Sequence, residues 1–108
     1  MTARMIVRHG DREWYWQSED DMLIFAIDRA FRYRLTAGDT VYFSAVGAPV
    51  SGRSAATLII PPSAYVSFSY TNLDGSEIDA VMARVAELVD RDGGVTLDHE
   101  DKLVDDGR

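Results

Sequence analysis

The segment 78–89 constrains the fold most, because its apolar residues recur at helical spacing and fall on one side only. These apolar positions are Ile78, Val81, Met82, Val85, Leu88 and Val89. A helix with a single apolar side must bury that side against another layer of structure. The segment therefore predicts a helix that packs on a sheet or on another helix and ends at Gly93 and Gly94. Asp74 and Glu77 have the spacing of a capping box at its start.

A second one-sided helix is expected earlier in the chain, from Ser18 as N-cap to about Leu35, before Gly38. Three acidic residues at 19–21 suit the positive end of the helix dipole. The predicted inner face consists of Leu23, Ile24, Ile27, Ala30, Phe31 and Leu35. Both helices therefore need a shared apolar surface to cover.

Residues 4–17 predict the first part of that surface, a hairpin that turns at Gly10 and Asp11. Pairing outward from the turn places Arg8 opposite Glu13 and puts both tryptophans on one face with two apolar residues of the first strand. That face consists of Met5, Val7, Trp14 and Trp16. A slip of one residue would turn both tryptophans toward water, so we expect a firm register.

Further strands are predicted at 40–46, 56–60, 65–71 and 95–97, with a loop at 47–54. The sequence thus predicts an α+β domain over residues 1–97, with an acidic tail over 98–108. Its elements have the order β-β-α-β-β-β-α-β, in a mainly antiparallel sheet with two helices packed on one face.

Composition limits the classes of function. The chain has 108 residues, no cysteine and a net charge of −7, all of it in residues 56–108, since residues 1–55 carry seven Arg and seven acidic residues. A negative surface repels phosphate backbones, so we expect no direct nucleic-acid binding. No signal peptide is visible, and the longest apolar run is 22–27, so we expect a cytoplasmic protein that does not enter a membrane.

No motif for catalysis, metal binding or nucleotide binding is apparent. The two histidines, His9 and His99, lack metal-ligand spacing, and no P-loop, G-x-G-x-x-G or G-x-S-x-G pattern occurs. We therefore expect no cofactor. Arg53, in the predicted loop, is a secondary candidate for holding an anion.

The outer side of the first helix is unusual. It combines the residue types enriched at protein interfaces, namely Met22, Phe25, Arg29, Arg32 and Tyr33. Phe25 is expected to lie nearly opposite the inner face, among charged residues, where it packs either against a binding partner or under a neighbouring loop or edge strand. Ile6 and Tyr15, on the polar face of the hairpin, are secondary candidates of the same kind.

Three stretches carry a resemblance to a known group: RLTAGDTVYFS, SGRSAATLIIPPSAYVSFSY and IDAVMARVAELVDRDGGVTL. Over about residues 34–97 the chain resembles small actinobacterial domains of unknown function, many of which carry the name ATP-dependent DNA ligase. It departs from them in the hairpin, at WYWQSEDD. The resemblance implies a fold and an actinobacterial or actinophage origin. It does not imply ligase activity, because the only lysine, Lys102, begins KLVDDG rather than K-x-D-G.

Three hypotheses on function follow. The leading one is a small protein-binding module that acts on another protein or on its own copy as a homodimer. The alternative is an acidic DNA mimic that inhibits a DNA-binding host protein, suggested by the charge of residues 56–108. The third is a small-ligand-binding domain or enzyme with a pocket beside Arg53.

Overall fold

The computed structural model describes residues 3–50, 53–71, 73, 77–98, 100 and 102–104, with the backbone alone described at 46–50 and 53–55. The order of its strands and helices is the predicted one. These elements are β1 (Ala3–His9), β2 (Arg12–Ser18), α1 (Asp21–Thr36), β3 (Val41–Val50), β4 (Arg53–Ile60), β5 (Tyr65–Ser69), α2 (Ile78–Asp92) and β6 (Gly94–Leu97).

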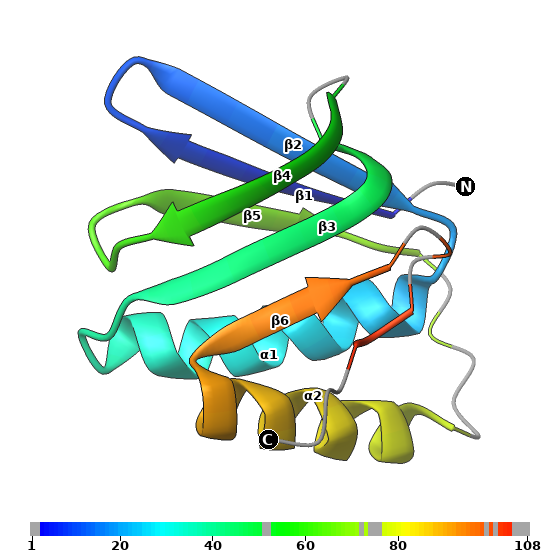
Figure 1. Ribbon diagram of the computed structural model, residues 1–108. Helices are drawn as coiled ribbons and strands as arrows, with labels where there is room; N and C mark the ends of the chain where they lie inside the picture. The colour runs from blue at the N-terminus through cyan, green and yellow to red at the C-terminus, as the bar shows by residue number, and fades with distance from the viewer. Residues whose placement is uncertain are drawn as a thin grey trace.

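The sheet has the strand order β4-β3-β2-β1-β5, and all of these neighbours are antiparallel. The last strand, β6, pairs with β3 in parallel. Both helices lie together beneath the strands in Figure 1, which confirms the predicted α+β architecture with the helices on one face. In the described part of the chain, no helix is long and apolar enough to cross a membrane.

The β1–β2 hairpin has the predicted register, from His9 opposite Arg12 to Arg4 opposite Gln17. Gly10 has a φ of 64° at the turn, a left-handed conformation that glycine adopts readily. Next to the turn, a guanidinium nitrogen of Arg8 lies 2.7 Å from a carboxylate oxygen of Glu13. The alternation of apolar and polar residues was therefore sufficient to determine the pairing of these two strands.

The predicted loop at 47–54 is wrong at 47–50 and 53–54, because β3 continues to Val50 and β4 begins at Arg53. Residues 51 and 52 lie outside the described part of the chain. The regular pairing of β3 with β4 is interrupted between Val46 and Val50, where the register shifts. Gly47 and Pro49 lie within this irregular stretch. Such residues typically mark bulges and bends within strands, and β3 curves strongly here, so that its end reaches β2 (Figure 1).

Both predicted helix starts are wrong in detail. The N-cap of α1 is Asp20, whose carboxylate accepts a hydrogen bond from the backbone N–H of Leu23 at 3.0 Å. The Ser18 hydroxyl instead accepts from the N–H of Asp20, at 3.1 Å. The N-cap of α2 is Glu77, which makes no side-chain capping bond, and Asp74 lies outside the described residues.

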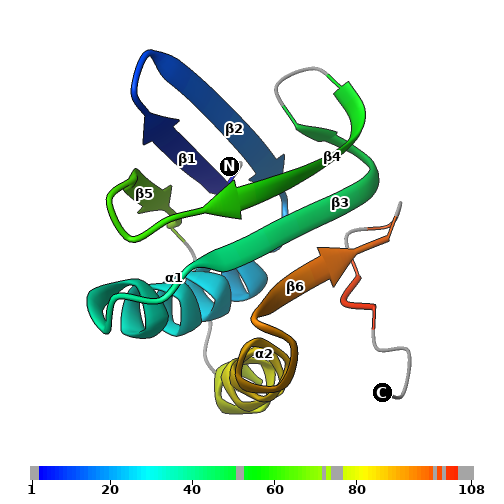
Figure 2. The same ribbon diagram turned by 60° about the vertical axis from the view of Figure 1, so that its left-hand side comes forward.

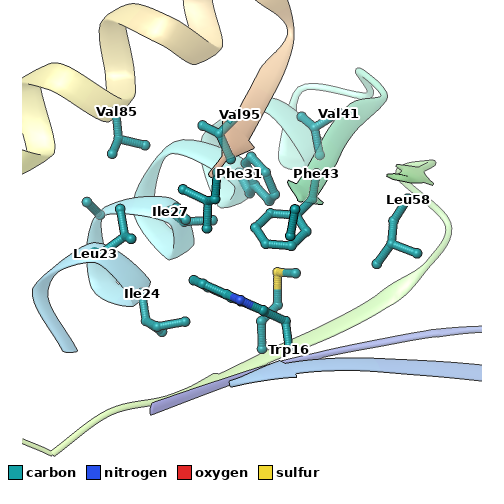
Figure 3. Close-up of a cluster of buried hydrophobic side chains, with 14 of the residues drawn as sticks. Trp16, Leu23, Ile24, Ile27, Phe31, Val41, Phe43, Leu58, Val85 and Val95 are labelled. Atoms are coloured by element: carbon teal, nitrogen blue, oxygen red, sulfur yellow. The ribbon is translucent and has the colours of Figure 1, made fainter. Parts of the chain in front are cut away.

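The core lies between the curved sheet and the two helices, and Trp16 is its largest fully buried side chain (Figure 3). Trp16 is fully buried, and its ring centroid lies 4.8 Å from that of Phe43. Isoleucines of α1 approach this pair from the helical side (Figure 3). The indole N–H of Trp16 has no hydrogen-bond partner among the residues that the structure describes. Trp16 therefore stabilises the fold through packing, because it joins the inner faces of β2 and β3.

The described residues of the predicted acidic tail return to the sheet. Leu103 forms an isolated antiparallel bridge with Leu97, and the N–H of Val104 donates to the carbonyl of Thr96 at 2.8 Å. Leu103 is half-buried against the core. This part of the tail therefore lies along β6.

Candidate functional site

Phe25 packs against its own chain, which is one of the two alternatives that the sequence left open for this residue. Its ring meets the edge of Tyr70 at a centroid distance of 5.2 Å and an angle of 87°. The guanidinium of Arg29 lies 5.1 Å from the centre of the same ring. Phe25 is thus half-buried between residues of its own chain, and any docking surface on α1 must be centred elsewhere.

Asp28 is one of the charged residues that the helical pattern placed on the outer side of α1 beside Phe25, and it is also covered. Its side chain is only 2% exposed. One nitrogen of Arg32, Nη2, donates to both carboxylate oxygens, at 2.8 and 3.0 Å. The hydroxyl of Tyr70 donates a third hydrogen bond, at 2.9 Å. Three charge-assisted hydrogen bonds allow a carboxylate to be buried at this helix–strand boundary.

The sequence contained one signal for this network and lacked another. Asp28 and Arg32 have the i, i+4 spacing of a helical ion pair. Tyr70, however, is 42 residues from Asp28 in the chain. Only the arrangement of β5 beside α1 brings the phenol to the carboxylate.

This network predicts a stability change at alkaline pH. Burial raises the pKa of Tyr70 above the usual value of 10.0, and its hydrogen bond to Asp28 raises the pKa further. The folded state therefore holds the phenol proton more tightly than the unfolded state does. The stability that this contributes is fully present below pH 10 and is lost as the pH rises through the folded pKa.

We expect Tyr70→Phe to lower the free energy of unfolding at pH 7 by about 1–2 kcal/mol, because Asp28 loses a donor. The difference in the free energy of unfolding between the native protein and the variant should shrink from about pH 10 upward. In this range the native protein loses the stability that comes from the Tyr70 phenol proton, and the variant has no such proton to lose. Urea unfolding at several pH values between 7 and 11 measures it. A constant difference over this range contradicts the role assigned to Tyr70.

Three of the remaining four candidates on α1 lie together, namely Arg29, Arg32 and Tyr33. Tyr33 is the most exposed large apolar side chain among the described residues, at 75%. Tyr33 stands at the edge of a groove of about 260 Å³ between α1 and α2, which lie side by side in Figure 2. We call this the helical groove, lined by Ala26, Arg29, Ala30, Tyr33, Met82, Ala86, Val89 and Asp90. A second hollow shares Arg29 and Tyr33 with this groove and also includes Arg32.

Charge divides the rims of the helical groove. Arg29 stands on the α1 rim and Asp90 on the α2 rim. Neither forms an ion pair with any residue in the described part of the chain. Between the rims the lining is mainly Ala, Met and Val. The groove thus offers an apolar surface with one cation and one anion available for a partner.

Met22, also on α1, is partly buried. The secondary candidates Ile6 and Tyr15 lie elsewhere, as cross-strand partners on the sheet face that points away from the helices. Tyr15 is 39% exposed, and the guanidinium of Arg4 lies 5.8 Å from its ring centre. Arg53 begins β4, and its side chain lies outside the part that the structure describes.

Comparisons of the chain with protein-family models, with curated proteins and with solved structures find no match. The resemblance to small actinobacterial domains therefore stays a prediction from the sequence. Any argument on function starts from the surfaces described above.

Proposed function

We propose that this protein is a protein-binding module that docks a second copy of itself on the helical groove. The observation that carries the proposal is the pair of opposite charges, Arg29 and Asp90, on opposite rims of one apolar groove. An isologous dimer uses the same patch on both subunits, so a patch with complementary halves suits it.

The helices fit such a pairing geometrically. A two-fold axis that runs along the groove places α1 of one copy over α2 of the other. Arg29 of each copy then faces Asp90 of the other, so that one contact contains two opposite-charge pairs. Charge pairs across an interface mainly determine its register and partner choice.

Tyr33 supplies the apolar contribution to this contact. Exposed tyrosines are among the residues that contribute most to binding when a partner buries them. An apolar cavity of about 150 Å³ holds a benzene molecule. The helical groove, at about 260 Å³, therefore has room for an aromatic ring from the facing copy.

A charge-reversal series tests the proposal. Arg29→Asp and Asp90→Arg should each weaken self-association by about tenfold or more, because each leaves two like-charge pairs in the dimer. The double variant should restore association to nearly the native value, since both pairs are then present in reversed orientation. Sedimentation equilibrium of the full chain measures the dissociation constants.

Arg12→Asp is the matched control, because Arg12 is exposed and lies beside the hairpin turn, at the start of β2. It should leave self-association unchanged. A native chain that is monomeric at all concentrations, or a double variant no better than the single ones, contradicts the proposal.

A further inference from the structure

The outer edge of β5 is a second surface, and the hollow beside it shares no lining residue with the helical groove. Within the described part of the chain, β5 pairs with β1 alone, so it ends the sheet on that side. Its sequence, YVSFS, contains no charge and no proline, and its pairing with β1 has no bulge. Natural edge strands usually carry a charge, a proline or a bulge, which prevents pairing with another chain.

A hollow of about 250 Å³ runs between this edge and α1. We call it the β5 groove, lined by Asp28, Arg32, Leu35, Ala64, Val66, Ser67 and Phe68. Apolar side chains of β5 form one wall and α1 forms the other. A strand added beside β5 would lie about 4.8 Å from it and would point alternate side chains into this hollow.

Arg32 gives the β5 groove its charge. Its side chain is 60% exposed, and it binds Asp28 through Nη2 alone. A guanidinium has five N–H donors, so Nε and Nη1 remain for a second carboxylate. Asp28 is buried beneath it and holds the arginine in place.

From these observations we infer that the β5 groove binds an extended, acidic peptide segment of a partner protein as an added β-strand. The outer edge of β5, which is unpaired among the described residues, supplies main-chain hydrogen bonds, and this is the recurring mode of peptide recognition by strand addition. The apolar wall selects apolar side chains at every second position. Arg32 selects an acidic side chain at one end. The inference is independent of the proposed self-association, which uses the helical groove, because the two grooves share no lining residue.

Two synthetic peptides of eight residues, with alternating valine and threonine, test the inference. One carries glutamate at one end and the other carries lysine. Fluorescence anisotropy with the full chain should give a dissociation constant about tenfold lower for the glutamate peptide, because charge-assisted pairs with arginine are strong. Arg32→Gln should remove this preference, and Arg12→Gln, the matched control on the hairpin, should preserve it.

N-methylation of the glutamate peptide tests the strand geometry without changing the protein. In an added strand, every second N–H points to β5, so methylation should weaken binding at one alternate set of positions only. Asp90→Arg should bind the peptide as the native chain does, since Asp90 lines the helical groove and does not line the β5 groove. The inference is overturned if neither peptide binds, if Arg32→Gln keeps the preference, or if methylation acts equally at all positions.

Discussion

Replacing Trp16 by alanine is expected to lower the free energy of unfolding by about 3–5 kcal/mol, the usual range for a buried tryptophan. Trp16 is fully buried and packs on Phe43, where the inner faces of β2 and β3 meet. The stability of a typical domain is about 5–15 kcal/mol, so this loss is a large fraction of the total. Urea unfolding at pH 7, followed by circular dichroism, measures the change.

Trp16→Phe separates the two contributions of this residue. It keeps an aromatic ring beside Phe43 and removes an indole N–H that has no partner among the described residues. The loss of packing is then offset by the removal of a buried unsatisfied donor, so we expect a change below about 1.5 kcal/mol. Tyr15→Ala, at a half-exposed neighbouring position, is the control and should cost less than Trp16→Ala. Equal losses of the free energy of unfolding for Trp16→Ala and Tyr15→Ala contradict the role of Trp16 in packing the core.

The features of the fold that local patterns determine were predictable. The alternation around Gly10 predicted the pairs of the β1–β2 hairpin from His9–Arg12 to Arg4–Gln17, because only one register buries Trp16 with Met5 and Val7. The last pair, Ala3 with Ser18, was not predicted, because Ser18 was expected to begin the helix. The one-sided helices predicted which faces are buried. The loop prediction failed at Gly47 because composition cannot distinguish a turn from a bulge within a continuous strand.

The candidate site was less predictable, for a physical reason. A helical projection gives the direction of a side chain but does not show what the rest of the chain places there. Phe25 and Asp28 were both expected to point outward, and both are covered because Tyr70 follows β5 past that side of α1. Tyr33 points away from this strand, so the sequence correctly placed it on the surface.

The surroundings of Gly94 were also not predictable, because nothing in the sequence distinguishes it from Gly93, the glycine that ends α2. A Cβ atom at Gly94 would overlap the backbone carbonyl oxygen of Tyr42 and would lie 2.5–2.6 Å from two carbons of the Tyr42 ring. Gly94 is directly opposite Tyr42 in the parallel pairing of β6 with β3. Any side chain here must therefore push β6 away from β3.

We expect Gly94→Ala to lower the free energy of unfolding by about 3 kcal/mol or more, at the upper end for overpacked sites, because the obstacle is backbone. Since α2 leads directly into β6, the same variant should displace Asp90 and weaken self-association through the helical groove. Urea unfolding and sedimentation equilibrium of one sample measure both effects.

Gly93→Ala is the matched control, one residue earlier. Gly93 has a φ of 85° and no atom within 4 Å of an added Cβ. An alanine there meets only the strain of a left-handed backbone, about 1–2 kcal/mol. If Gly93→Ala proves as destabilising as Gly94→Ala, the close approach of β6 to Tyr42 is not what limits this position. A larger loss of stability for Gly94→Ala than for Gly93→Ala locates the constraint in the contact between β6 and β3. The same contact then determines where α2 and its rim of the helical groove lie.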